Sequence, residues 1–164
     1  MDALLILSLL WMGILLGIYL APLIHDHRIG DLSDVQYVAM HQMRDKTFAR
    51  VMPAMGLSIL ALAGVSVAIA MAPGIPRQLG GLAVGLLVID IVFTVRRQVP
   101  INRRIQAWTG SEIPVEWMQL RDMWARQHLV RLSLATLACA CFAVAVLLSL
   151  SHSQGIASGF ASAS

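Results

Sequence analysis

The hydrophobic positions of this chain gather into four long runs separated by polar connections. The runs cover residues 3–24, 51–72, 79–95 and 129–150. A hydrocarbon core about 30 Å thick is crossed by roughly 20 helical residues, so these runs have about the length that a bilayer requires. The pattern predicts an all-α fold: an integral membrane four-helix bundle forming a single domain over residues 1–150. The Ser-, Gly- and Ala-rich stretch 151–164 is expected to be a disordered tail.

Helices two and four are expected to extend beyond the membrane into the cytoplasm. Ser33 followed by Gln36 is the signature of a helix N-terminal capping box, and a helix that begins there would continue through the second run. The stretch 116–128 forms a second stem that runs directly into the fourth apolar run, and we expect the two stems to pack on each other. The third helix is expected to leave the membrane after Val95 and to be interrupted at Pro100.

Composition supports a membrane protein and adds an orientation. Hydrophobic residues make up 58% of the chain and charged residues 13%, which is far from the composition of a soluble domain. Eleven of the twelve Lys and Arg residues lie in the connections 25–50 and 96–131, and only Arg77 lies elsewhere. The positive-inside rule therefore predicts a cytoplasmic-type membrane, with both basic connections in the cytoplasm and both termini outside. The basic charge is explained by this topology and by anionic lipid headgroups, so no nucleic-acid partner is expected.

The fourth helix carries an unusual stripe of polar and aromatic side chains. Trp117, Arg121, Trp124, His128 and Arg131 recur at spacings of three and four residues, which places all five on one helical face. Interfacial anchoring in the membrane explains a Trp or an Arg taken singly. A shared face for two indoles, two guanidiniums and one imidazole favours a binding site.

The topology brings further polar residues to the same end of the bundle. Candidate catalytic groups there are His41, His128, Asn102, Arg121 and Arg131, and candidate substrate-binding rings are Trp117, Trp124 and Tyr37. Arg side chains bind negative charge, Trp rings stack on flat molecules, and His acts as acid or base near neutral pH. The combination suits an anion or an aromatic enol.

A metal or haem held by His41 and His128 is left open by the pattern. His41 lies ten residues before Val51, or about 15 Å along a straight helix, which places it level with Asn102 and Arg121 rather than with His128. The chain has no HExxH, no CxxC and no pair of ExxH motifs, so the cofactor is not defined. Haem, copper and iron are all compatible with two histidines.

Three further features have competing interpretations. Asp90 lies inside the third apolar run and is either a functional group or a packing residue hydrogen-bonded to Ser58, Ser66 or a backbone group. His25 and His27 form a His-x-His pair, which on a polar loop is more often solvated than metal-binding. Cys139 and Cys141 point in different directions on a helix and are expected to be packing residues.

Four stretches together resemble a known family. They are HQMRDKTFARVMP at 41–53, VPINRRIQAW at 99–108, the P-x-x-W of 114–117 and LRDMWARQHLVR at 120–131. The chain resembles the anthrone oxygenase-like family of small four-helix membrane proteins. The resemblance implies oxidation of a small organic substrate by dioxygen, as in fungal enzymes that convert anthrones to anthraquinones. It points to His41, Asn102, Trp124, His128 and Arg131, with Trp117 and Arg121 as secondary members.

Two functions follow as hypotheses. In the first, the chain is a membrane oxygenase or monooxygenase whose pocket opens at the cytoplasmic end of the bundle. There His41 or His128 would act as base or ligand, Arg121 and Arg131 would stabilise an oxyanion, and Asn102 would orient the substrate. In the second, the chain is a non-enzymatic membrane module that binds a lipid, a quinone or a protein partner. Both hypotheses allow a homo-oligomer in the bilayer.

Overall fold

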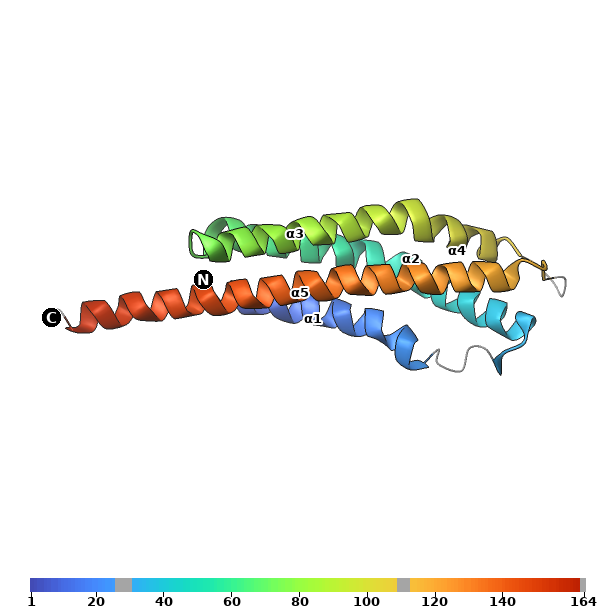
Figure 1. Cartoon of the computed structure of the whole chain (residues 1–164), viewed down its shortest axis with the longest axis horizontal. Helices are drawn as coiled ribbons and strands as arrows, with labels where there is room; N and C mark the ends of the chain where they lie inside the picture. Colours follow the sequence, from blue (N-terminus) through green and yellow to red (C-terminus); the bar gives the residue numbers. More distant parts are fainter. Residues whose placement is uncertain (26–30, 109–112, 163–164) are drawn as a thin grey trace.

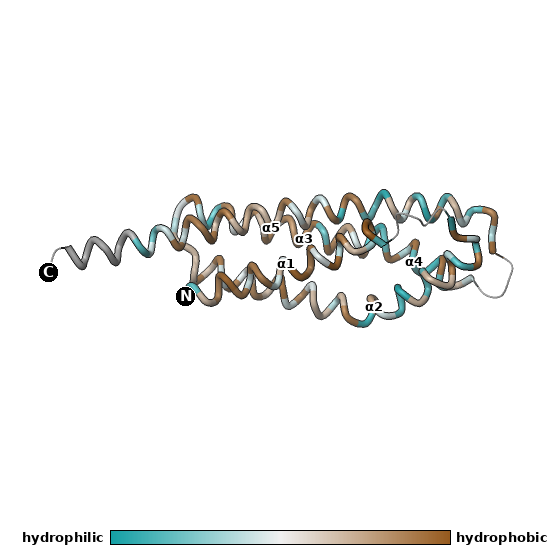
Figure 2. The backbone as a smooth tube through the Cα atoms, turned by 90° about the horizontal axis from the view of Figure 1, so that it is seen from below, coloured by the Kyte–Doolittle hydropathy of each residue, from teal (hydrophilic) through white to brown (hydrophobic). Residues whose placement is uncertain are grey.

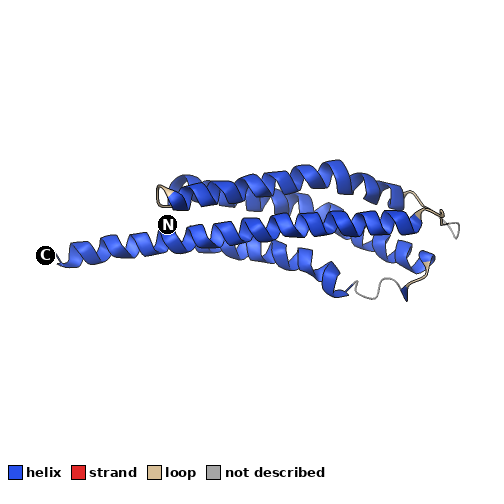
Figure 3. Cartoon of the chain, viewed as in Figure 1, coloured by secondary structure: helices blue, strands red, loops and turns tan. Residues whose placement is uncertain are grey.

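The computed structural model describes residues 1–25, 31–108 and 113–162, with side chains described up to Gln154. This part of the chain consists of helices joined by short turns and forms an elongated four-helix bundle, which confirms the predicted fold class (Figures 1 and 3). The elements are α1 (Asp2–His25), α2 (Asp34–Val65) with the π-helical turn η2 (Ser66–Ala70), α3 (Ile75–Phe93), the π-helical turn η3 (Thr94–Gln98), α4 (Val99–Gln106) and α5 (Trp117–Ser162).

Four of these helical segments are long and apolar enough to cross a membrane. They are Asp2–His25, Asp34–Ala70, Ile75–Gln106 and Trp117–Gln154. The chain is therefore an integral membrane protein by length and composition. The end of α1, the start of α2, the end of α4 and the start of α5 lie together at one end of the bundle, and hydrophilic residues concentrate towards it (Figures 1 and 2). We call this the polar end.

The predicted long second helix is confirmed, including its first turn. The Ser33 side chain accepts a hydrogen bond from the Gln36 backbone N–H, and the Gln36 side chain accepts one from the Ser33 backbone N–H. This reciprocal pair satisfies two N–H groups that a helix end otherwise leaves open. Helix two then continues without interruption to Ala70.

The expected interruption near Pro100 takes the form of a π-helical turn, and the helix does not break. The α-helical pattern ends at Phe93 and resumes at Val99, with η3 between them, and the helix as a whole continues from Ile75 to Gln106. The Val99 N–H bonds to the Thr94 carbonyl, five residues back. A proline lacks the N–H of a regular helix turn, and it stands here at the start of α4 where that loss is tolerated.

Helix α5 agrees with the sequence prediction at the polar end and differs from it at the other end. At the polar end, α5 begins at Trp117 and supplies one stem. The predicted pairing of stems occurs with an addition: Tyr37 and Val38 of α2 pack with Leu120 of α5, and Ile101 and Ile105 of α4 complete this small core. At the other end the helix continues to Ser162, whereas the composition predicted a disordered tail after Leu150.

Away from the polar end the helices pack tightly. Contact between α3 and α5 is the most extensive, and Ala83, Ala138 and Ala145 are fully buried there in the main core. Small side chains let helix backbones approach closely in lipid. On α3, Gly80 has the same role, since a Cβ added there would lie 2.8 Å from Val67 Cγ2.

Helix α2 stands apart from this close packing in its middle. Its buried residues are Tyr37, Val38 and His41 near one end and Met55, Ile59 and Ala63 near the other. Residues 42–54 are all described, and none of them is buried. The middle of α2 therefore forms the wall of a hollow rather than part of the core.

Candidate functional site

A cavity of about 630 Å³ lies between α2 and the other helices. Its wall is formed by α1, α2, the continuous helix α3–η3–α4, and α5. Apolar residues such as Leu15, Met52 and Ile91 line much of it. The polar and aromatic residues of the wall are Tyr19, His41, Arg44, Asp45, Phe48, Asp90, Thr94, Gln98, Asn102, Arg103, Trp124, His128 and Arg131.

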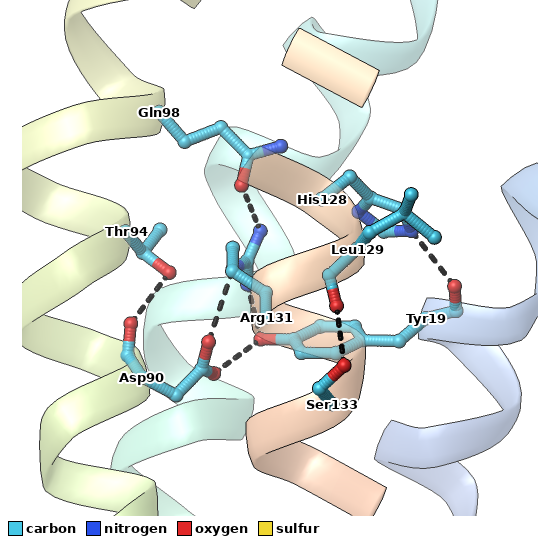
Figure 4. A network of polar contacts seen from close by, with 8 residues as sticks. All are labelled: Tyr19, Asp90, Thr94, Gln98, His128, Leu129, Arg131 and Ser133. Carbon is cyan, nitrogen blue, oxygen red and sulfur yellow. Dashed lines mark hydrogen bonds and ion pairs between the residues drawn. The ribbon is translucent and has the colours of Figure 1, made fainter. Parts of the chain in front are cut away.

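At the deep end of the cavity, Arg131 joins three helices through its guanidinium (Figure 4). Its Nε lies 3.2 Å from Asp90 Oδ1, its Nη1 donates to Gln98 Oε1 at 2.6 Å, and its Nη2 donates to the Tyr19 hydroxyl. The same hydroxyl donates to Asp90 Oδ2 at 2.8 Å. A buried charge is tolerated in the membrane when it is paired and hydrogen-bonded, and both charges here are.

This arrangement decides how Asp90 is held. Ser58 and Ser66, the partners suggested by the sequence, are engaged elsewhere: Ser58 accepts from Trp11 Nε1 at 2.9 Å, and Ser66 lies 2.7 Å from the Ser8 hydroxyl. The partners of the Asp90 carboxylate are Arg131 and Tyr19. The predicted oxyanion role of Arg131 is weakened as a consequence, because Asp90 already balances its charge.

His128 is held in one orientation beside the cavity. Its Nε2 lies 2.8 Å from the Tyr19 backbone carbonyl, as Figure 4 shows, and a carbonyl oxygen only accepts, so Nε2 donates. In the neutral imidazole the lone pair is then on Nδ1. The ring stacks on Trp124 with centroids 5.0 Å apart and planes 5° apart. The residue is 5% exposed. This is how a protein fixes the tautomer of a histidine.

Trp124 is the centre of a second group nearer the polar end. Arg44 Cζ lies 4.7 Å from its ring centroid, within cation–π range, and the His41 ring meets it edge-on at 5.4 Å. The indole Nε1 donates to Asn102 Oδ1 at 3.0 Å, and the Asn102 amide in turn donates to Asp45 Oδ1. Side chains from α2, α4 and α5 thus fix the plane of this indole.

The structure divides the predicted site residues into two sets. His41, Asn102, Trp124, His128 and Arg131 line the cavity together. The remaining three residues are outside its lining and form an outer group at the polar end: the Tyr37 and Trp117 rings lie 5.6 Å apart, and Arg121 Cζ lies 5.4 Å from the Trp117 centroid. Arg121 also pairs with Asp122 at 3.0 Å.

Some residues that line the cavity were not predicted from the sequence. Arg44 and Asp45 lie in the charged stretch 44–46, which looks like the solvated face of a stem, yet Arg44 is three residues after His41 and shares its side of the helix. Tyr19 is an unremarkable tyrosine in an apolar run, and Gln98 follows two arginines. Of the histidine pair, His25 is exposed at the end of α1, and His27 lies outside the described residues.

A metal or haem at His41 and His128 stays a prediction. In the described ranges 1–25, 31–108 and 113–162, no group of three or more His, Cys, Asp or Glu side chains is arranged to hold a metal ion. His128 has one ring nitrogen committed to the Tyr19 carbonyl, and both imidazoles contact the indole of Trp124. Two histidines fall below that group size, so a haem or metal held by this pair is still an expectation from the sequence.

The fold and the cavity define a class: a four-helix integral membrane protein that surrounds a chamber with paired charges, fixed aromatic rings and an oriented histidine. The family model described as anthrone oxygenase matches residues 40–141, which is more than half of the chain. The protein belongs to the anthrone oxygenase family, as its sequence motifs indicated, and this membership suggests an oxygenase-like function. No curated protein and no solved structure matches the chain.

The matched range and the cavity overlap closely. Residues 40–141 include His41, Arg44, Asp90, His128 and Arg131. Tyr19 lies before the matched range but supplies both the carbonyl that orients His128 and a hydroxyl to Asp90. Helix α1 therefore completes a site whose other parts belong to the family match.

Proposed function

We propose that this protein is a membrane oxygenase that removes a proton from a small enolisable or phenolic substrate and exposes the resulting anion to dioxygen inside the cavity. The observation that carries the proposal is His128, an imidazole with a fixed tautomer that lines a chamber large enough for a small aromatic molecule. A histidine so placed is suited to act as a general base near neutral pH.

The chemistry balances without a redox group on the protein. The base takes one proton from a substrate CH₂ or CH–OH group that is activated by an adjacent ring or carbonyl. The electron-rich anion transfers an electron to dioxygen, the resulting radical and superoxide combine into a peroxide anion, and the protonated base returns its proton to give the hydroperoxide. For a CH₂ group, loss of water then leaves a ketone, so the substrate and one dioxygen give the ketone and one water. The proton taken by the base returns in that water.

The other cavity residues would bind and orient the substrate. Arg44, with its guanidinium over Trp124, is placed to attract negative charge that develops on the substrate oxygen. Trp124 and His41 would stack on or enclose the rings, and Asn102 acts as a positioning residue because both ends of its amide are engaged by Trp124 and Asp45. Arg131 would hold the walls of the chamber in place, and Arg121 has no contact role in this scheme.

The orientation in the membrane is part of the proposal. The positive-inside rule places the polar end in the cytoplasm and both termini outside. Seven of the twelve basic residues lie in the connection 96–131, which is at the polar end. The variants His25→Cys and His152→Cys, labelled with a membrane-impermeant thiol reagent, would report on which side of the membrane each position lies.

The test uses His128→Gln, since a glutamine amide can still donate to the Tyr19 carbonyl but is no general base. On purified protein we expect dioxygen uptake with anthrone-like phenols, and label from ¹⁸O₂ in the product. The variant should lose turnover by about 10²–10⁴-fold, the usual contribution of a general base. His152→Gln, exposed on α5 outside the cavity, is the matched control. Unchanged turnover in folded His128→Gln protein would contradict the role of His128 as the general base.

A non-enzymatic binding module would use the same cavity differently. It would bind a lipid, a quinone or an aromatic molecule with no dioxygen uptake. His128→Gln would then change affinity by a small factor without abolishing a reaction. The two functions are separated by whether ¹⁸O₂ label appears in any recovered ligand.

A further inference from the structure

The wall between α2 and the helix α3–η3–α4 is closed at two points. At the first, the Ile91 side chain packs over Gly56, where an added Cβ would lie 4.0 Å from Ile91 Cδ1. At the second, Asn102 donates a hydrogen bond to Asp45. Eleven residues separate the two points on each helix, or about 16 Å at 1.5 Å per residue. We call the stretch between them the α2–α3 window.

The residues of the window belong to the cavity and to the outer surface at the same time. Ala49, Pro53 and Val95 all line the cavity and are all exposed, Val95 by 60%. A residue that contributes to both surfaces lies on the rim of an opening. Leu57, one residue past the Gly56–Ile91 contact, also lines the cavity and is 62% exposed, so the opening reaches as far as this contact. The cavity therefore opens sideways, through the wall of the bundle.

The rim side chains Ala49, Pro53 and Val95 are apolar, and they lie at the polar-end limits of the apolar runs 51–72 and 79–95, where these two long helices leave the membrane core. Two polar side chains next to it are turned to internal partners: Thr94 donates to the Asp90 carbonyl at 2.8 Å, and Gln98 accepts from Arg131. Arg50 and Arg96, which follow Ala49 and Val95 in the chain, are exposed. Hydrocarbon or an aromatic ring passing between the apolar rim side chains gives up no hydrogen bond there.

We propose that the α2–α3 window is a lateral portal through which a bilayer-dissolved substrate enters the cavity. The ligand class is a lipid-soluble aromatic molecule with one ionisable hydroxyl or enolisable carbon. Its ring body passes between Pro53 and Val95 and comes to rest with the polar group towards Arg44 and His128. This inference rests on the cavity of the proposed function but is independent of the reaction.

The experiment measures entry without turnover. The full chain is reconstituted in phosphatidylcholine vesicles, and a membrane-partitioning brominated naphthol is mixed in while tryptophan emission is followed. All variants carry Trp11→Phe, Trp108→Phe and Trp117→Phe, so that the emission comes from Trp124, which lines the cavity and is quenched when the heavy-atom probe enters. The plugged variant is Ala49→Phe with Val95→Phe, one substitution on each side of the window. The control is Val51→Phe with Val92→Phe, which are exposed on the same helices but outside the cavity lining.

We expect the plug to slow the cavity-specific quenching phase at least tenfold, with the control within twofold of the unmodified chain. A quenching rate that is unchanged in folded plugged protein would overturn the portal. Equal slowing in the plugged and control variants would also overturn it, because the effect would then not depend on the window. Running the series in the His128→Gln background separates the two proposals: gated quenching without turnover preserves the portal even if the reaction assignment fails.

Discussion

The two sides of α3 are built on different principles. Towards α5, the contact is close and rests on buried alanines such as Ala83 and Ala138, which allow the backbones to approach. Towards α2, the helices touch at Gly56–Ile91 and at Asp45–Asn102 and are separated in between by the cavity. The tight side supplies stability and the open side supplies space. Substitutions on the two sides should therefore differ in what they damage.

The largest effect is expected at the charge cluster that joins α1, α3 and α5. Arg131→Leu leaves the carboxylate of Asp90, whose side chain is 4% exposed, without its counter-charge. Removing one partner of a buried ion pair costs about 3–5 kcal/mol, and we expect a loss of that size in the free energy of unfolding. Denaturant titration in mixed micelles, followed by circular dichroism, measures it.

Arg126→Leu is the control for this prediction, since Arg126 is exposed on the same helix. The double variant Asp90→Asn with Arg131→Leu should recover part of the loss, because no charge is then left unpaired. A single variant as stable as the control would show that the cluster does not hold the three helices together.

A smaller effect is expected from adding one methyl group at two points of the contact between α3 and the second helix, one closely packed and one beside the cavity. At Gly80 the new Cβ would lie 2.3 Å from Met71 Sδ and 2.8 Å from Val67 Cγ2, so Gly80→Ala should cost about 1–3 kcal/mol of unfolding free energy through overpacking. At Gly56 the nearest atom is 4.0 Å away, and Gly56→Ala should be neutral or slightly stabilising. Equal costs at both glycines would contradict the inference that the contact between α3 and the second helix is closely packed at Val67 and Met71 and loose beside the cavity.

The smallest effect is expected for a change confined to the cavity. Trp124→Phe keeps an aromatic ring but removes the N–H that donates to Asn102 at 3.0 Å, an interaction worth about 1 kcal/mol. We expect KM to rise about fivefold with little change in kcat and in melting temperature. Trp108→Phe, outside the cavity lining, is the control. A loss of kcat with unchanged KM would instead place the indole in the chemical step.

The sequence was sufficient for the features that depend on local pattern. Run length predicts the four spans, and the Ser33–Gln36 pair predicts the start of α2, because both signals are contained within one helix. The stripe on α5 likewise predicts that Trp124, His128 and Arg131 share a face, and all three line the cavity. Family membership was indicated by motifs that the family match then covered.

The features that depend on which helix lies against which were not predictable in the same way. Asp90 could have met a serine of α2, but its partners come from α1 and α5, 71 and 41 residues away. Arg44 has the composition of a solvated stem, and only the separation of α2 from the bundle turns it into a wall residue. Pro100 suggested a break because a π-helical turn leaves no clear signal in one sequence.

The hydroxyl that Tyr19 contributes to Asp90 also has a consequence for biosynthesis. The chain emerges from the ribosome in order, so α1 is already present when Asp90 enters the bilayer, whereas Arg131 has yet to be made. Tyr19 is the first hydrogen-bond donor of the mature cluster that the carboxyl can find. We therefore expect the Tyr19 hydroxyl to be the first partner of the Asp90 carboxyl during insertion, and to remain its partner after Arg131 joins the cluster.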